Sequence, residues 1–361
     1  MVSNDLSCDN RVHRMAMTLH NANYDVLVVG RKLPWSIDLP TVPYQRKRLR
    51  FLFTKGPLFY AEMNIRYFLF LLFRPFSVAT ANDLDTLPAV FCATVIRRKP
   101  MVYDSHEYFT EVPELQNRPI VKRIWTTIER WILPHLKNCI TVCESIANIY
   151  QEKYGVTVSV VRNLPFRQEK TDLQNGGNQD DGNIILYQGS LNVGRGLELL
   201  IGAMRYVENA KLLVVGDGDI RADLQNLVQQ KKLDGVVQFT GRVSYSEVQK
   251  FTKRATIGVS LEDDCCANYR YALPNKLFDY IQSCKPVLVS DLPEMARIVS
   301  RYRCGEILTE RTEQALAAQI SDLLKNREKL RGYAANCELA ARELCWECEE
   351  QIVRNVYANL L

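Results

Sequence analysis

The sequence predicts an α/β fold of two Rossmann-like, doubly wound domains that face a cleft. Short apolar runs alternate with amphipathic segments along most of its 361 residues, which is the order of strands and helices in a parallel sheet. One polar stretch with three glycines interrupts the alternation, as a linker would. We therefore predict an N-terminal domain over 1–166, a linker over 167–183, a second domain over 184–340 and a C-terminal helix over 341–361 that could cross back to the first domain.

In the first half, apolar runs that end in polar turns predict strands over 25–30, 76–81, 101–103, 140–142 and 158–161. Apolar residues at helical spacing predict helices over 11–19, 87–96, 121–133 and 146–153. A parallel sheet normally opens with a strand of about five residues. Here only residues 1–3 precede a polar loop, so the first strand is expected to be truncated.

The same alternation restarts in the second half. The predicted strands are 184–187, 211–215, 236–239, 257–261 and 287–290. The predicted helices are 196–206, 221–231, 246–252, 275–283 and 292–300, with a helical end from 313 onward. Ligands of doubly wound sheets gather at the carboxyl ends of the strands. The residues that follow these strands are therefore the first candidates for a site.

Composition is that of a soluble globular protein, with 47% hydrophobic and 24% charged residues. The 11 cysteines are odd in number and scattered, and no signal peptide opens the sequence. We therefore expect reduced thiols in a cytoplasmic protein. Cys345 and Cys348 have C-x-x-C spacing without a second pair, so a structural helix face is favoured over a zinc site.

Residues 44–74 combine seven basic residues and one acid with nine interleaved aromatic residues. This mixture suits an anionic membrane surface, where basic groups meet phosphates and rings reach headgroup depth. No apolar run approaches the roughly 20 residues that span a bilayer. The alternative is a buried helix with a solvated basic flank. Nucleic acid is not expected as a partner, because no recognition motif accompanies the charge.

A glycine-rich loop, GSLNVGRG, follows the first strand of the second domain and precedes a helix. Its glycines let the backbone approach a phosphate, the helix start offers free N–H groups, and Arg195 adds a positive fork. The loop is neither a Walker loop nor a complete G-x-G-x-x-G motif. It indicates either a phosphate site at Gly189, Ser190 and Arg195 or a glycine turn with a surface arginine.

Two further loops of this domain place small or polar residues at strand ends. Gly216 and Gly218 follow one strand, and Arg242 and Val243 follow the next. Each loop alone is only a turn. Several such loops that converge at one edge of a sheet suit a nucleotide.

The stretch 271–291 reads as a loop, a helix, a turn and a buried strand. Pro274 suits the first turn of the helix, and Asn275 and Asp279 share one helix face. The Asp279 carboxylate could hold ribose hydroxyls or simply complement the helix dipole. Because the neighbouring loops provide a nucleotide for it to hold, ribose binding is the favoured interpretation.

His106 directly follows a predicted strand and is flanked by Asp104 and Glu107. A lone histidine is often structural, but its position at a strand end favours a functional role. Two D-x-D patterns, at 83–85 and 217–219, lie in different halves and lack a third ligand. No metal site is therefore predicted.

Several segments of the second half resemble the nucleotide-sugar domain of the family-4 retaining glycosyltransferases of the GT-B fold. They are GSLNVGRGLELLIGAM, KLLVVGDGDIR, VQFTGRVSYSEV and LPNKLFDYIQSCKPVLVSDLPE. The first half contains NDLDTLPAVF and VYDSHEYFTEVPEL, which are similar to the acceptor domain of a bacterial, group 1 branch of that family. The resemblance covers nearly the whole chain.

The resemblance implies a role for each candidate residue. Arg195 would neutralise the donor diphosphate, Asp279 would hold the ribose, and His106 would lie near the reacting sugar. The nucleotide-facing loops and the P-N-K motif would supply the remaining site residues, which are Gly189, Gly216, Gly218, Arg242, Val243, Asn275 and Lys276.

Three positions depart from the family pattern. Ser190 stands where the family has a second basic residue, Tyr271 stands at the first acid of the E-x7-E pattern, and Cys284 stands where glycine is usual. The positive charge at the diphosphate would then depend on a replacement, for which Lys276 is the candidate. Glu262 is near the missing acid but not in register with it.

The resemblance implies an enzyme that transfers a sugar with retention of anomeric configuration, without a metal or other cofactor. The donor would be a nucleotide-diphosphate sugar such as a UDP- or GDP-sugar, and the acceptor a glycan or a lipid-linked sugar. Such an enzyme would serve polysaccharide or lipopolysaccharide biosynthesis in the cytoplasm, peripheral at the inner face of the cytoplasmic membrane. Two alternatives stay open: a nucleotide-sugar-binding assembly subunit with little activity, and a GT-B-fold sugar-nucleotide epimerase.

Overall fold

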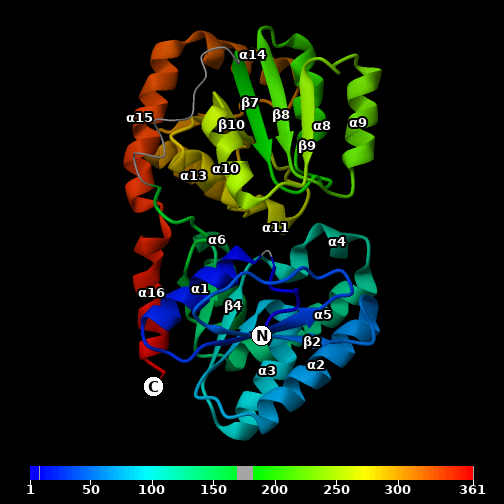
Figure 1. The fold of residues 1–361 in the computed structure, drawn as a ribbon, viewed down its shortest axis with the longest axis vertical. Coiled ribbons are helices and arrows are strands. Elements are labelled where there is room, and N and C mark those ends of the chain that lie inside the picture. The colour runs from blue at the N-terminus through cyan, green and yellow to red at the C-terminus, as the bar shows by residue number, and fades with distance from the viewer. Residues whose placement is uncertain (8, 169–181, 361) are drawn as a thin grey trace. The chain divides into compact units, whose positions relative to one another are not determined.

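The computed structural model describes residues 1–7, 9–168 and 182–360, which belong to two compact units (Figure 1). The N-terminal unit comprises Met1–Asn163 and Glu349–Leu361, and the C-terminal unit comprises Leu164–Cys348. The chain therefore passes between the units at two places. Most of the predicted linker, residues 169–181, lies outside the described residues.

The N-terminal unit is built on parallel strands. One sheet contains, in spatial order, β3 (Ala79–Asn82), β4 (Met101–Ser105), β5 (Cys139–Thr141) and β6 (Val158–Val160). A separate parallel pair consists of β1 (Leu27–Lys32) and β2 (Gln45–Arg50). The helical segments are α1 (Asn10–Asn21), α2 (Gly56–Phe73), α3 (Asp83–Arg97), η1 (Phe109–Glu111), α4 (Pro113–Gln116), α5 (Pro119–Ile132), η2 (Leu133–His135) and α6 (Glu144–Tyr154).

Residues 1–4 lie between β1 and β3. The Val2 N–H donates to the Val29 carbonyl at 3.0 Å, and the Asn82 N–H donates to the Met1 carbonyl at 3.1 Å. Backbone hydrogen bonds through this short segment therefore join the two sheets of the unit. The segment occupies the position at which the sequence predicts a truncated first strand.

No strand is predicted from the sequence at β2, which is a difference between expectation and structure. Its residues are Gln-Arg-Lys-Arg-Leu-Arg, with Leu49 as the one apolar side chain, so hydrophobic alternation could not reveal it. β2 pairs with β1 on one side only, and charged side chains protect such an edge from pairing with another chain. Four basic residues of the 44–74 segment lie on this strand: Arg46, Lys47, Arg48 and Arg50.

α2 buries one side and exposes apolar residues on another. Its buried residues are Phe59, Met63, Tyr67 and Leu71. Its large exposed apolar residues are Leu58, Ile65, Leu69 and Phe73. The predicted alternative, a buried helix with a solvated basic flank, therefore holds for one side of α2 only. Among the described residues, no helix combines the length and apolar character needed to cross a bilayer.

The C-terminal unit contains a six-stranded parallel sheet (Figure 1). Its strands, in spatial order, are β12 (Gly305–Ile307), β11 (Val287–Val289), β10 (Ile257–Ser260), β7 (Asn183–Gln188), β8 (Ala210–Val215) and β9 (Val237–Gly241). From β7 the chain first adds β8 and β9 on one side, and then β10, β11 and β12 on the other. This is a doubly wound order, and it confirms the predicted α/β class. The three-residue β12 was not predicted.

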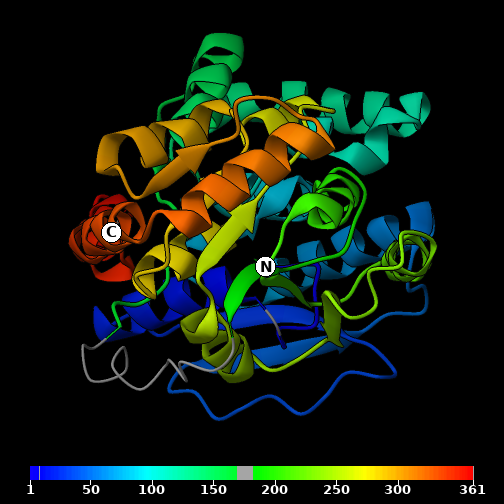
Figure 2. The ribbon, with the colours of Figure 1, turned by 90° about the horizontal axis from the view of Figure 1, so that it is seen from above.

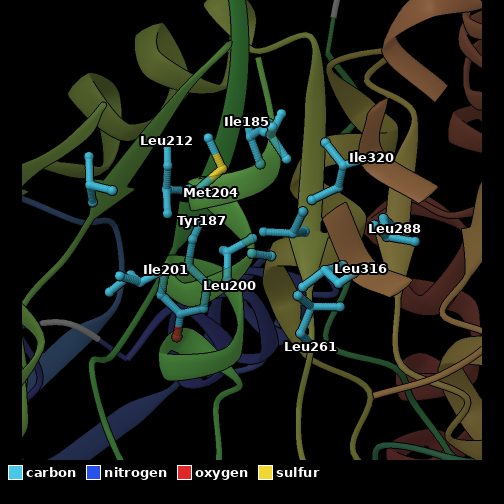
Figure 3. Close-up of a cluster of buried hydrophobic side chains, with 14 of the residues drawn as sticks. Ile185, Tyr187, Leu200, Ile201, Met204, Leu212, Leu261, Leu288, Leu316 and Ile320 are labelled. Carbon is cyan, nitrogen blue, oxygen red and sulfur yellow. The ribbon is translucent and has the colours of Figure 1, made fainter. Parts of the chain in front are cut away.

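Helices cover both faces of this sheet (Figures 1 and 2), and a hydrophobic core lies against each face. Along β7, Ile185 and Tyr187 belong to one core, and Ile184 and Leu186 belong to the other. Figure 3 shows part of the first core, in which Ile185 and Tyr187 cluster with residues of flanking helices, such as Leu200. A strand buried on both faces has the continuous apolar sequence from which these strands were predicted.

Apart from one unpredicted four-residue helix at Ala267–Arg270, the flanking helices follow the predicted ranges closely. They are α8 (Leu197–Ala203), η3 (Met204–Tyr206), α9 (Arg221–Gln230), α10 (Tyr245–Arg254), α11 (Ala267–Arg270), α12 (Asn275–Gln282), α13 (Pro293–Tyr302) and α14 (Glu313–Lys325). Pro274 precedes α12 as its N-cap, one residue earlier than its predicted place in the first turn. The extended backbone at this proline separates α11 from α12.

The C-terminal region forms α15 (Arg327–Glu343) and α16 (Trp346–Ala358). From Glu349 onward α16 belongs to the N-terminal unit. The buried Glu349 carboxylate accepts hydrogen bonds from Arg162, with a shortest distance of 2.6 Å from Nη2 to Oε1. The Tyr357 hydroxyl lies 2.7 Å from Thr80 Oγ1 of β3. The end of the chain therefore crosses back to the first half, as the sequence allowed.

Candidate active site

The carboxyl ends of β7, β8 and β9 carry the glycine loops that the sequence predicts to converge. The Gly189 N–H donates to the Val215 carbonyl at 2.9 Å, and the Gly216 N–H donates to the Gly241 carbonyl at 3.2 Å. β7 and β10 are neighbours from which the chain winds in opposite directions, so their carboxyl ends form the switch point at which such sheets bind ligands. The three loops lie side by side next to this point.

Gly216 and Gly218 allow two loops to touch. Gly216 has a φ of +144°, and a Cβ atom there would lie 1.9 Å from the Gly189 carbonyl oxygen. A Cβ atom on Gly218 would lie 2.5 Å from the Leu191 nitrogen. Any larger residue would push the loop after β8 away from the loop after β7. These glycines therefore have a structural role in addition to the nucleotide contact that the resemblance implies.

Arg195 lies between two glycines with positive φ, Gly194 at +81° and Gly196 at +71°. Its guanidinium carbon is 4.7 Å from the centroid of the Tyr269 ring, and its Nη1 is 3.5 Å from Glu262 Oε1. The side chain is only 25% exposed. The arginine on this glycine turn is therefore packed and paired, and it is not fully solvated.

Lys276, on α12, reaches the same carboxylate as Arg195. Its Nζ lies 2.8 Å from Glu262 Oε1 and 4.0 Å from the centroid of the Tyr187 ring. The face of an aromatic ring attracts a cation, and the lysine side chain is only 7% exposed. The fold thus brings two cations, 81 positions apart in the sequence (276 minus 195), to one oxygen atom.

Glu262 is the central residue of this cluster, and it was not among the predicted site residues. Its side chain is fully buried, and its Oε2 accepts a hydrogen bond from Ser260 Oγ at 2.7 Å. Burial raises the pKa of Glu262, but the positive charges of Lys276 and Arg195 lower it by more than burial raises it. The net shift is therefore downward, and the carboxylate is charged. Two cations and one carboxylate leave one excess positive charge, which favours an anionic ligand.

Asp279 lies on α12 one turn after Asn275. Its Oδ2 accepts a hydrogen bond from Gln188 Nε2 at 2.9 Å, and its Oδ1 accepts one from the Tyr245 hydroxyl at 3.1 Å. Because α12 begins at Asn275, Asp279 is already past the first turn, where the helix-dipole effect is strongest. The structure therefore favours an oriented, half-buried carboxylate over a helix-dipole partner.

The remaining predicted residues of this unit lie around the cluster. Ser190, Asn275 and Arg242 have exposed side chains, and Val243 is half-buried against the core that contains α10 and α12. The Ser190 carbonyl accepts a hydrogen bond from the Tyr187 hydroxyl at 2.7 Å. Tyr271, at the end of α11, is half-buried.

In the N-terminal unit, both ring nitrogens of His106 contact carboxylates. Nδ1 is 3.2 Å from Asp83 Oδ2, and Nε2 is 3.2 Å from Asp104 Oδ2. The fully buried Asp104 also receives a two-point contact from Arg11, with Nε 3.0 Å from Oδ2 and Nη2 2.6 Å from Oδ1. The predicted flanking residue Asp104 thus orients His106.

Burial alone lowers the pKa of His106. The Asp83 and Asp104 carboxylates raise it by more than burial lowers it, and the resulting pKa is about 9. Burial raises the pKa of Asp83 to about 7, although His106 opposes this shift. Asp83 also has a φ of +60°, which is uncommon outside glycine and is often retained at functional sites. At neutral pH His106 is therefore a cation fixed between two acids.

Sequence reasoning also overlooked the residues that orient the predicted ones: Arg11, Gln188, Tyr245, Ser260 and Glu262. Glu262 follows the buried strand β10 by two residues, and that position at a strand end could have marked it. Arg11 could not be found in this way, because its partner Asp104 is 93 positions away. Within the described residues, no group of three or more His, Cys, Asp or Glu side chains could hold a metal ion.

Two models of known protein families match the chain, one in each half. Residues 9–164 match the model described as Glycosyltransferase Family 4, and residues 168–339 match the model described as Glycosyl transferases group 1. The chain belongs to the glycosyltransferases. The first match covers most of the N-terminal unit, and the second covers the glycine loops, Arg195, Lys276 and Asp279.

One curated relative is an uncharacterized glycosyltransferase of the archaeon Methanocaldococcus jannaschii. It is 33% identical over 127 residues, a stretch that covers 33% of this chain and 32% of the relative. The matched stretch therefore spans about a third of that protein.

Solved glycosyltransferases share the fold over nearly the full length. Sucrose-phosphate synthase from Thermosynechococcus elongatus has a TM-score of 0.80 at 18% identity, with 97% of this chain and 92% of that chain covered. HepE of Anabaena, solved with UDP-glucose, has a TM-score of 0.73 at 14% identity and coverages of 100% and 98%. WaaG, a glycosyltransferase involved in lipopolysaccharide biosynthesis, has a TM-score of 0.68 at 16% identity and 98% coverage of both chains. These likenesses establish the fold of this glycosyltransferase.

Proposed function

We propose that this glycosyltransferase transfers a sugar from a nucleotide-diphosphate sugar to a glycan or lipid-linked acceptor, with retention and without a metal ion. The observation that carries the donor assignment is a pair of cations, half-buried Arg195 and buried Lys276, held on Glu262 beside the switch point of a doubly wound sheet. The UDP-glucose complex of HepE and the lipopolysaccharide role of WaaG support the donor and the pathway class.

The two cations would act on the leaving group. Transfer breaks the bond between the anomeric carbon and a phosphate oxygen, so negative charge develops on the departing nucleotide diphosphate. Arg195 and Lys276 stabilise that charge most effectively because they are positioned before the reaction and shielded from water. Lys276 then supplies the second positive charge that is missing at Ser190.

The nucleotide would lie along the neighbouring strand ends. The Asp279 carboxylate, oriented by Gln188 and Tyr245, would accept hydrogen bonds from ribose hydroxyls. The close-packed loop at Gly216 would present backbone N–H groups to the nucleotide, and Arg242 would border the base. Each of these contacts follows a different strand or helix, as is usual for a nucleotide site in an α/β sheet.

His106 would serve the acceptor side as a fixed positive charge. A histidine whose pKa is about 9 is protonated at neutral pH, so it cannot act there as a general base. We infer that the departing phosphate oxygen accepts the proton of the acceptor hydroxyl. His106 would instead orient and stabilise the electron-rich groups around the reacting sugar.

The 44–74 segment would hold the enzyme at the inner face of the cytoplasmic membrane. Leu52 and Phe53 are exposed between β2 and α2, and three nearby basic residues in the sequence, Lys47, Arg50 and Lys55, are also exposed. Apolar side chains that enter the headgroup region and basic groups that meet anionic lipids bind a membrane together. A lipid-linked acceptor would be presented at the same surface.

The decisive experiment measures release of nucleotide diphosphate from a panel of UDP- and GDP-sugars, with a membrane lipid extract as the source of acceptor. We expect release from one donor, and Arg195→Ala should reduce it at least a hundredfold while the circular dichroism spectrum stays native. Full activity of Arg195→Ala would refute the diphosphate assignment. Donor binding without release would support an assembly subunit, and conversion of the sugar without release would support an epimerase.

Retention and metal independence need separate measurements with the donor and the acceptor that show transfer. The anomeric configuration of the new glycosidic bond, determined by NMR, should match that of the donor sugar. Activity should be unchanged after incubation with EDTA. An inverted product, or a loss that Mg²⁺ or Mn²⁺ restores, would refute the corresponding part of the proposal.

A further inference from the structure

Cys345 and Cys348 form a thiol pair at the start of α16. Cys345 directly precedes the helix and Cys348 is its third residue, so the C-x-x-C spacing places both on one side of the first turn. Their sulfur atoms are 3.5 Å apart, and both cysteines are free thiols. Each Sγ is also 3.5 Å from the Arg342 carbonyl oxygen. The two thiols therefore already face each other.

The two cysteines differ in exposure. Cys345 is fully buried, whereas Cys348 is exposed. Arg167 Nη2 lies 3.6 Å from Cys345 Sγ, so a guanidinium is available to stabilise a thiolate at the buried position. Burial nevertheless raises the pKa of Cys345 to about 11. Cys348 is thus the accessible thiol that can react with an external disulfide first, and Cys345 is the buried thiol that can then attack the mixed disulfide.

We propose that Cys345 and Cys348 are a reversible dithiol–disulfide site whose redox partner is a low-molecular-weight disulfide such as oxidised glutathione. The Cys348 thiolate attacks one sulfur of the partner, which forms a mixed disulfide and releases one glutathione thiolate. The Cys345 thiolate then attacks Cys348 Sγ and releases the second glutathione. Two protein thiols are oxidised, one external disulfide is reduced, and the two thiol protons pass to the released thiolates.

The position of the pair makes this chemistry relevant to the whole protein. The chain passes from the C-terminal to the N-terminal unit between Cys348 and Glu349. Trp346, which directly follows Cys345, is buried, and its N–H donates to the Pro165 carbonyl at 2.8 Å. A disulfide would therefore close a four-residue loop (345 to 348) immediately before this connection.

The test is a redox titration of the full-length protein in buffers of reduced and oxidised glutathione. After denaturation, free thiols are alkylated and tryptic peptides are analysed by mass spectrometry. Both cysteines fall in one peptide, residues 343–354. As the proportion of oxidised glutathione rises, we expect this peptide to lose two hydrogen atoms and take up no alkylating reagent. Dithiothreitol should restore double alkylation.

The adjacent pair Cys265 and Cys266, in peptide 255–270, is the internal control. Neighbouring Cα atoms are about 3.8 Å apart, closer than the roughly 4.4–6.8 Å that disulfides prefer, so this peptide should stay doubly alkylated. In Cys348→Ser, which changes an exposed residue, Cys345 should remain unreactive while the protein is folded. The proposal is overturned if peptide 343–354 stays doubly alkylated in excess oxidised glutathione, or stops at a mixed disulfide.

Discussion

Glu262 occupies a position that would be costly for an isolated charge. Moving a carboxylate from water into the protein interior costs several kcal/mol unless paired groups compensate it. Here Ser260, Arg195 and Lys276 supply that compensation. The same contacts hold both cations in place before a donor arrives. A diphosphate would therefore meet positioned charges, and little reorganisation would be needed as the leaving group departs.

Replacing Glu262 with glutamine keeps the shape of the side chain and removes its charge. The two cations would then repel each other and lose their fixed positions, while the site would become more positive. We expect kcat to fall at least tenfold and the KM for the donor to stay the same or decrease. Steady-state kinetics would check this split, with Asp264→Asn, an exposed neighbour, as the control. A raised KM with unchanged kcat would contradict the positioning role.

Gly216→Ala tests whether the loop contact is required. A Cβ atom 1.9 Å from the Gly189 carbonyl oxygen cannot be accommodated without moving one loop, and the backbone there is strained for alanine. We expect the unfolding free energy to fall by about 1–3 kcal/mol in urea denaturation. Gly235→Ala is the matched control, because its Cβ atom would meet nothing within 4 Å. Equal stabilities of the two variants would show that the loops tolerate separation.

The environment of His106 predicts a pH dependence of stability. Its pKa rises from 6.5 to about 9 in the folded protein, so the folded state binds the proton more tightly than the unfolded chain. This contribution is complete below pH 6.5 and disappears as the pH rises to about 9. Urea denaturation across this window should show a loss of about 3 kcal/mol that is absent in His106→Asn but present in His135→Asn. Parallel pH profiles for wild type and His106→Asn would refute the ion pairs.

At the scale of elements, the basic aromatic segment contains β2 and α2, whose sequences differ in how well their apolar residues predict secondary structure. α2 has enough apolar residues to be expected as a helix, but which of them face the interior depends on its packing against α3. β2 has almost no apolar residue, and its pairing with β1 sets its conformation. The exposed residues of both elements share one segment because only residues 51–55 separate β2 from α2.

Substituting glutamine for three exposed basic residues, Lys47, Arg50 and Lys55, tests whether this part of the protein binds an anionic membrane. Each basic residue near an anionic membrane contributes about 1 kcal/mol, so the affinity for vesicles with anionic lipid should fall by roughly two orders of magnitude. Vesicle flotation would measure it. The control variant neutralises three exposed lysines of the C-terminal unit, Lys211, Lys250 and Lys325. Unchanged flotation of the first variant would exclude this surface.

At the scale of the whole molecule, each unit has its own sheet and cores, and the chain passes between them twice. The final segment completes the N-terminal unit, since Glu349 and Tyr357 contact Arg162 and Thr80 there. A residue near the end of the sequence can therefore determine the stability of the first half.

Glu349→Ala should show this effect. The substitution leaves Arg162 without its buried partner, and the loss of one member of a buried ion pair typically costs about 3–5 kcal/mol. We expect a lower urea midpoint for a probe in the N-terminal unit, such as the fluorescence of a single tryptophan at Trp125. Gln351→Ala, an exposed change on the same helix, should leave it unaltered. A shift confined to probes in the C-terminal unit would contradict the assignment of this segment.

Much of the fold and part of the site could be predicted because their signals are local. Apolar runs buried on both sheet faces revealed the strands of the C-terminal unit, and glycines at strand ends revealed its loops. Arg195, Lys276 and Asp279 could be proposed as site residues because each lies in a short segment with a recognisable family pattern. None of these inferences required knowledge of a contact between distant residues.

The remaining features depend on tertiary contacts. Lys276 could be proposed as a replacement charge, but only folding shows that it shares an oxygen of Glu262 with Arg195. His106 could be placed at a strand end, whereas its charge depends on Asp83 and Asp104. The physical reason is the same in each case. Burial and the pairing of charges determine what a polar residue can do, and both arise only when segments far apart in the chain pack together.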